Sequence, residues 1–151
     1  MKSVTAIVLE KELFKQFSKL KPGVVLDVGS KLAPYKDQIP HTKYMTLDIN
    51  PRVSPDITSD IHKVNWESNY FDTIIATEVV LEHCYSPEKA MTEIHKLLKN
   101  GGVCILSTEL SLGRIMLSRI NFLNLLISKI NLKDDFFPLG FNVYAIKSMS
   151  S

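Results

Sequence analysis

Two aspartates follow short apolar stretches and could hold one polar ligand between them. Asp27 ends the run 24–27, and Asp48 ends the run 44–48, 21 residues later. Runs of this kind are typical of buried parallel strands, and open α/β sheets bind ligands beyond the carboxyl ends of such strands. A carboxylate about 20 residues after a glycine-bearing turn is placed to accept hydrogen bonds from ribose hydroxyls. We therefore expect a nucleoside-like ligand, with a chance strand followed by an ordinary turn as the alternative, because Asp and Gly are common turn residues.

The composition limits what kind of protein this is. With 151 residues, 45% of them hydrophobic, the chain fits one domain over 1–151 with a genuine core. The net charge of +2, from 18 basic and 16 acidic residues, gives no signal for nucleic acid or a membrane surface. No apolar run approaches the roughly 18 residues of a membrane span or the length of a signal peptide. Cys84 and Cys104 are the only two cysteines and lack metal spacing, so we expect reduced thiols in a cytoplasmic protein, with a disulfide as the alternative.

Strands and helices alternate in the predicted element order, which favours a parallel sheet covered on both faces. Apolar residues at spacings of three and four predict a helix over 4–20. Ser86 and Pro87 are typical of a helix start, and Asn100 with Gly101 of its end. The predicted strands are 24–27, 44–48, 57–59, 73–76, 103–107 and 141–147, with a short helix over 34–39.

The stretch that begins at Leu112 and ends at Ile130 is apolar on much of its circumference. Helices that are apolar all round are usually buried, so we expect this one to lie on the sheet. A homodimer surface and an apolar substrate cleft remain the alternatives for the same pattern.

Several motifs, in order over residues 23–108, resemble the class I S-adenosylmethionine-dependent methyltransferases, most closely the type 11 group. The first family motif is a strand ending in Asp and then xGxGxG, which is similar to Asp27 and the five residues Val28-Gly29-Ser30-Lys31-Leu32 that lead to Ala33. Lys31 and Ala33 stand where the family has its second and third glycines. The resemblance implies a Rossmann-like three-layer α/β sandwich with a mostly parallel sheet and a shortened C-terminal part. It also implies S-adenosyl-L-methionine as the cofactor and in-line methyl transfer to an unidentified acceptor.

The resemblance also implies roles for individual residues. Asp48 would bind the ribose hydroxyls, and Ile49 would pack on the adenine. Asp60 would accept from the adenine amino group, with a helix cap as the alternative role, and the amide of Ile61 would face a ring nitrogen. The remaining cofactor-binding residues would come from the first turn and from the end of the fourth strand: Asp27, Gly29, Ser30, Lys31, Ala76 and Thr77.

The pair Glu82 and His83 is similar to a Leu-Glu-His motif that follows the fourth strand in this group. In some relatives an upstream acid, here Glu78, joins them to bind a divalent metal or to face the substrate. The two acids are spaced one residue further apart than is common in the group, so we expect no metal. His83 is the candidate base, because histidine titrates near neutral pH. A solvated acidic turn is the alternative.

Two other functions compete with a methyltransferase. A nicotinamide-dependent dehydrogenase would need GxGxxG directly after the first strand, where this chain has only Gly29, followed by Ser30 to Ala33. A non-catalytic domain that retains the fold and binds S-adenosylmethionine or S-adenosylhomocysteine is favoured by the altered glycine turn and the short C-terminal part.

Overall fold

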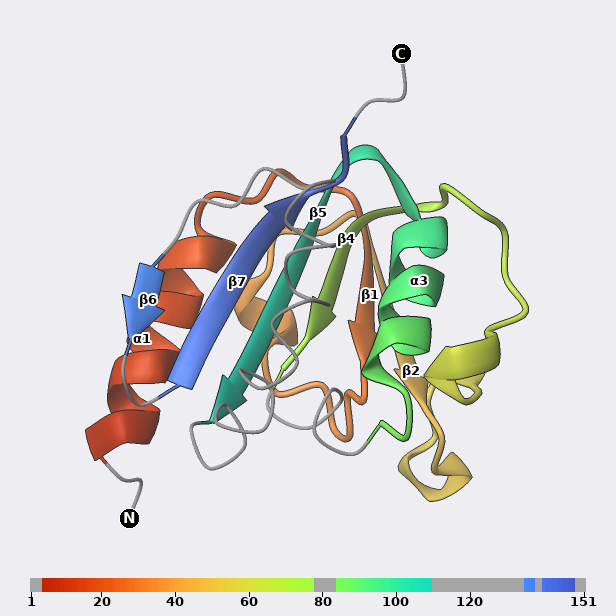
Figure 1. The fold of residues 1–151 in the computed structure, drawn as a ribbon, viewed down its shortest axis with the longest axis horizontal. Coiled ribbons are helices and arrows are strands. Elements are labelled where there is room, and N and C mark those ends of the chain that lie inside the picture. The colour runs from red at the N-terminus through yellow and green to blue at the C-terminus, as the bar shows by residue number, and fades with distance from the viewer. Residues whose placement is uncertain (1–3, 78–83, 110–134, 138–139, 149–151) are drawn as a thin grey trace.

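The structure, a computed structural model, contains one mixed sheet with helices on either side (Figure 1). It describes residues 4–77, 84–109, 135–137 and 140–148. Within these ranges the seven strands are ordered β3-β2-β1-β4-β5-β7-β6. The strands are β1 Val24–Val28, β2 Lys43–Asp48, β3 Ile57–Thr58, β4 Phe71–Ala76, β5 Leu98–Glu109, β6 Asp135–Phe137 and β7 Gly140–Ile146. The helices are α1 Val4–Phe17 and α3 Pro87–Leu97, with short 3₁₀ turns η1 Lys36–Gln38, η2 Pro51–Val53 and η3 Ile61–Lys63.

Strands β1 to β5 all run in the same direction, so their carboxyl ends lie along one edge of the sheet. Strand β1 lies between β2 and β4, and the strand order reverses there. In open α/β sheets such a switch point leaves a crevice for ligands beyond the strand ends. The predicted Rossmann-like fold with a mostly parallel sheet is confirmed.

Each face of the sheet packs against one described helix, because neighbouring residues of a strand point to opposite sides. On one face Val25 packs in a cluster with Leu13 and Phe17 of α1. On the other face Leu26 packs in a cluster with Ile94 of α3. Figure 1 shows α1 and α3 on opposite sides of the row of strands. The two apolar layers hold the strand ends in fixed positions.

The start of α3 agrees with the prediction, and its end does not. The Ser86 side chain accepts a hydrogen bond from the Lys89 amide, with Pro87 as the first helical residue. The helix stops at Leu97, before the predicted Asn100 and Gly101. These two residues instead lie inside β5, where Gly101 has φ +77°.

Lys147 explains this early end. Its buried Nζ donates to the carbonyls of His95 (2.9 Å) and Leu98 (2.7 Å), which belong to the last turn of the helix and its C-cap. It also donates to Oδ1 of Asn69 (2.8 Å). The Gly101 amide donates to the Lys147 carbonyl (2.8 Å), so the chain after α3 joins the sheet at once. Burial lowers the pKa of Lys147.

The C-terminal region contains a strand that the sequence analysis missed. The predicted strand 141–147 corresponds to β7, which runs antiparallel to β5. A further strand, β6, pairs antiparallel with β7, so the expectation of a single strand here is wrong. With only three residues, β6 is too short to show the alternation that identifies a strand. The predicted helix from Leu112 to Ile130 lies outside the described residues.

Asp72 ties the start of β4 to the start of β1. Its Oδ2 accepts a hydrogen bond from the Val24 amide (2.8 Å), and its Oδ1 accepts from Lys99 Nζ (2.8 Å). These contacts lower the pKa of Asp72 despite the opposing effect of burial. Asp72 therefore fixes the start of β4 against the start of β1.

We predict that Asp72→Ala lowers the free energy of unfolding by about 1–2 kcal/mol, because the Val24 amide loses its acceptor. Asp72→Asn keeps an acceptor oxygen and should lose less. Urea denaturation of the two variants and the wild type measures both values. Equal stability of Asp72→Ala and the wild type would contradict this role.

Candidate functional site

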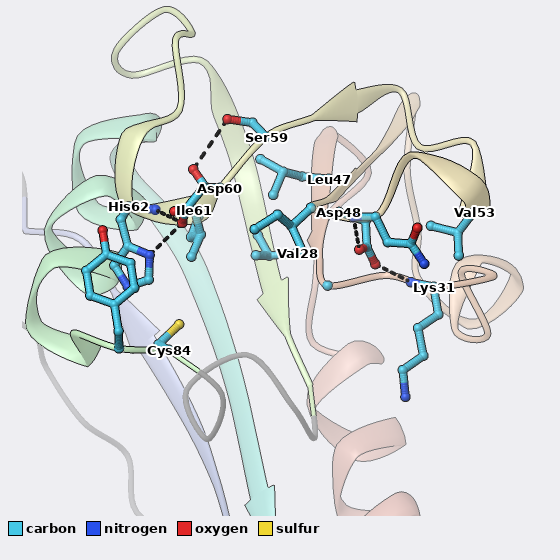
Figure 2. A pocket seen from close by; sticks show the side chains of 14 residues that line it. Val28, Lys31, Leu47, Asp48, Val53, Ser59, Asp60, Ile61, His62 and Cys84 are labelled. Carbon is cyan, nitrogen blue, oxygen red and sulfur yellow. Dashed lines mark hydrogen bonds and ion pairs between the residues drawn. The ribbon is translucent and has the colours of Figure 1, made fainter.

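A cavity of about 340 Å³ lies beyond the carboxyl ends of β1, β2 and β3 (Figure 2). This volume falls within the range of ordinary small-molecule sites. Six of the predicted cofactor-binding residues line it: Gly29, Lys31, Asp48, Ile49, Asp60 and Ile61. The remaining four, Asp27, Ser30, Ala76 and Thr77, are not part of the lining.

The turn after β1 keeps the backbone shape of a glycine-rich loop although it has one glycine. Gly29 has φ +68°, Lys31 has +47° and Ala33 has +52°. A left-handed conformation costs a non-glycine residue roughly 1–2 kcal/mol. The turn is held by two short hydrogen bonds, from the Gly29 amide to the Leu47 carbonyl (2.7 Å) and from the Ala33 amide to the Ser30 carbonyl (2.7 Å). Lys31 and Ala33 therefore adopt the left-handed backbone that glycine takes without strain.

Asp48 is the acid at the end of β2, and both of its carboxylate oxygens accept backbone hydrogen bonds. Oδ2 accepts from the Lys31 amide (3.2 Å), and Oδ1 accepts from the Asn50 amide (2.9 Å). The residue is 9% exposed and faces the cavity. Each carboxylate oxygen can accept more than one hydrogen bond, so capacity remains for two neighbouring hydroxyls.

Asp60 lies at the opposite end of the cavity and caps η3. Its Oδ1 accepts from the His62 amide (2.9 Å) and lies 2.5 Å from His62 Nδ1. The hydrogen bond from the His62 amide is the larger cause, and the contact with the His62 imidazole the next, of a lowered pKa for Asp60. The side chain is therefore a carboxylate at neutral pH. The helix cap is thus observed. Asp60 also lines the cavity, so its carboxylate can contact a ligand while it caps the helix.

Apolar side chains separate the two acids. Val28, Leu47 and Ile61 are buried and line the cavity. Figure 2 shows Val28 and Leu47 between Asp48 and Asp60, with Ile61 beside Asp60. Ile49 also lines the cavity but is 69% exposed. A flat apolar group can bind over these residues while its polar edges meet the acids.

His62 and Tyr85 are lining residues that the sequence analysis missed. The His62 ring is buried and stacks on the 71% exposed Tyr85 ring, with centroids 3.8 Å apart and planes 24° apart. Within the described residues, His62 Nε2 is buried without a hydrogen-bond partner. Neither residue belongs to a recognisable motif, and they come together only because α3 packs against η3. The other missed lining residues are Val28, Leu47, Asn50, Val53, Ser59 and Cys84.

Asp27 does not join the other two acids at the cavity surface. It is 1% exposed, and its Oδ2 accepts a hydrogen bond from the Tyr44 hydroxyl (2.8 Å). Burial raises the pKa of Asp27 to about 7, against the lowering effect of the Tyr44 bond and with a further increase from the charge of Asp48. The Asp27 side chain thus links the end of β1 to Tyr44 of β2. Ser30 and Ala76 are also buried, and Thr77 is half-buried.

The candidate base His83 and the candidate metal ligands Glu78, Glu82 and His83 lie outside the described residues. Among the residues that the structure does describe, no three His, Cys, Asp or Glu side chains are grouped to hold a metal ion.

Cys84 and Cys104 are free thiols, and burial raises the pKa of Cys84 to about 11. In the same ranges, no helix has the length and apolarity needed to cross a bilayer.

Because the pKa of Asp27 is higher in the folded protein than its ordinary value of 3.8, the folded state holds this proton more tightly than the unfolded state. We predict that stability falls as pH rises from about 4 to about 7, by up to about 4 kcal/mol. Asp27→Asn should remove this decrease, while Asp37→Asn at an exposed site should keep it. Denaturation at several pH values gives the slopes. An unchanged slope in Asp27→Asn would contradict the assignment.

Comparisons with known proteins place the chain in a family. The family model described as "Methyltransferase domain" matches residues 26–106, more than half of the chain. A search of curated proteins found no match. A candidate S-adenosyl-L-methionine-dependent methyltransferase from Methanococcus maripaludis has a similar structure, with TM-score 0.71, 15% identity, and coverage of 97% of this chain and 87% of that one.

Two further solved structures share the fold. The N-methyltransferase NodS from Bradyrhizobium japonicum, in complex with S-adenosyl-L-homocysteine, has TM-score 0.75 and 13% identity over 98% of this chain and 90% of its own. The CurJ carbon methyltransferase has TM-score 0.64 and 16% identity over 96% of this chain and 54% of its own. These likenesses show the shared fold, and the family match shows that the chain belongs to the methyltransferase domain family, whose cofactor is S-adenosyl-L-methionine.

Proposed function

We propose that the cavity binds S-adenosylmethionine with its ribose at Asp48 and its adenine over the apolar floor toward Asp60. The observation that carries this proposal is the placement of two carboxylates at opposite ends of one apolar cavity (Figure 2). A nucleoside has matching chemistry, because it joins a diol to a flat base with a polar edge.

The residues present fit this ligand. The Asp48 carboxylate is fixed by two backbone amides, so it can meet a cis-diol without rearranging. The Asp60 carboxylate is ionised and can accept from an amino group. The left-handed turn at Gly29 and Lys31 brings backbone close to the cavity, as a nucleoside-binding loop requires.

Methyl transfer requires few catalytic side chains. The cofactor supplies an electrophilic methyl group, whose bond to sulfur breaks with the electron pair staying on sulfur as the acceptor bond forms. Holding the acceptor atom, the methyl carbon and the sulfur in line lowers the barrier by positioning alone. The acceptor loses a proton if it was protonated, and His83 is the residue we propose to take it. The role of this chain is therefore to bind and orient.

The acceptor is a separate question from the cofactor. The similar structures include one N-methyltransferase and one carbon methyltransferase, so the fold does not select the acceptor atom. We propose a methyltransferase rather than a non-catalytic binding domain because the methyltransferase family model matches residues 26–106. Binding of the cofactor without turnover of any acceptor would favour the non-catalytic alternative.

We predict that Asp48→Asn weakens S-adenosylhomocysteine binding by about a hundredfold, because charged hydrogen bonds to the diol are lost. Isothermal titration calorimetry measures the loss. Asp56→Asn is the matched control, since Asp56 also contacts β2, through Thr46, but does not line the cavity.

A ligand without the diol sharpens this test. The 2′-deoxy analogue of S-adenosylhomocysteine should bind the wild type more weakly than the parent does, and the Asp48→Asn variant should show a much smaller difference. An equal preference in both proteins would place the ribose elsewhere. A folded wild type that binds neither compound would contradict the proposed function.

We also predict that cofactor binding needs no divalent metal, because the described lining offers no group of three metal ligands. Titrations with and without a chelator should give the same affinity. A large loss of affinity in chelator, restored by adding magnesium or zinc, would contradict this prediction.

A further inference from the structure

Lys31 places a positive charge at the cavity where the family motif has a glycine. The Lys31 residue lines the cavity, and its amide donates to Oδ2 of Asp48 (3.2 Å). Its left-handed backbone, with φ +47°, is the conformation that a glycine would adopt at no cost. A lysine at this position strains the backbone, but it places a side chain at the cavity that a glycine would lack.

The ammonium group is available for a ligand. The side chain is exposed, and within the described residues no carboxylate lies within ion-pair distance of Nζ. Figure 2 shows the Lys31 stem at the Asp48 end of the cavity, on the opposite side from Asp60 and His62.

The geometry of a nucleoside decides which part of the ligand comes near this lysine. The base is attached to C1′ and the 5′ carbon to C4′, so the two substituents flank the 2′,3′-diol. If the diol binds Asp48 and the base extends toward Asp60, the 5′ substituent extends the other way, toward the turn that holds Gly29 and Lys31. In S-adenosylmethionine that substituent ends in an amino acid with a carboxylate.

We propose that Lys31 binds the carboxylate at the amino-acid end of the methyl donor. This inference rests on the proposed function, because it uses the same orientation of the ligand. Lys31 thereby favours ligands that carry the amino acid over nucleosides that lack it. Because the ammonium is exposed, the pair contributes modestly and weakens as salt rises.

Two ligands with the same nucleoside and sulfur test the proposal. S-adenosylhomocysteine carries the amino acid, and 5′-methylthioadenosine lacks it. Titration calorimetry at low salt should show that Lys31→Met lowers the affinity for S-adenosylhomocysteine by about fivefold and leaves that for 5′-methylthioadenosine unchanged. Lys31→Arg should keep the wild-type ratio, and the ratio should fall with added salt in the wild type but not in Lys31→Met.

Lys36→Met is the matched control, because it removes one lysine from the same segment without touching the cavity lining. Thermal unfolding of each variant checks that the protein is folded. An unchanged ratio of the two affinities in Lys31→Met would overturn the proposal, and so would an equal loss for both ligands, which would place the charge at the nucleoside. Failure of the wild type to bind even 5′-methylthioadenosine would instead overturn the proposed function, and this inference with it.

Discussion

The contact between the end of β2 and the turn after β1 is the constraint on which the site depends. The Gly29 amide donates to the Leu47 carbonyl, and the Lys31 amide donates to the Asp48 carboxylate. These bonds fold the turn over the neighbouring strand end, so the loop and the acid form one wall of the cavity. The parallel pairing of β1 and β2 sets the register that makes both bonds possible.

The three predicted acids show how position in the sheet decides what a carboxyl group does. Asp27 points into the interior beside Tyr44, where burial raises its pKa to about 7. Asp48 lies at the rim, held by two amides. Asp60 caps η3, where hydrogen bonds lower its pKa. The same side-chain type thus serves as a buried hydrogen-bond acceptor, as a rim residue held by two backbone amides and as an ionised helix cap.

Much of the fold could be predicted because its signals are local. The apolar runs before Asp27 and Asp48 identify two central strands, and Ser86 identifies the start of α3. The end of α3 could not be predicted, because Lys147, far along the chain, supplies the donors that end it.

The residues of the candidate site could likewise be predicted only where the signal is local. Asp48, Asp60 and Gly29 belong to spaced motifs, and the structure brings all three to the cavity. His62 and Tyr85 were missed because their stacking depends on tertiary packing between η3 and the segment before α3. The sequence also pointed to Asp27 as a ligand contact, since spacing along the chain does not distinguish a rim position from a buried one.

A crystal structure of the protein with S-adenosylhomocysteine tests the central claim most directly. Our account predicts the two ribose hydroxyls within hydrogen-bonding distance of the Asp48 carboxylate and the adenine ring lying over Val28, Leu47 and Ile61. A ligand bound in any other orientation, with its ribose away from Asp48, would contradict it.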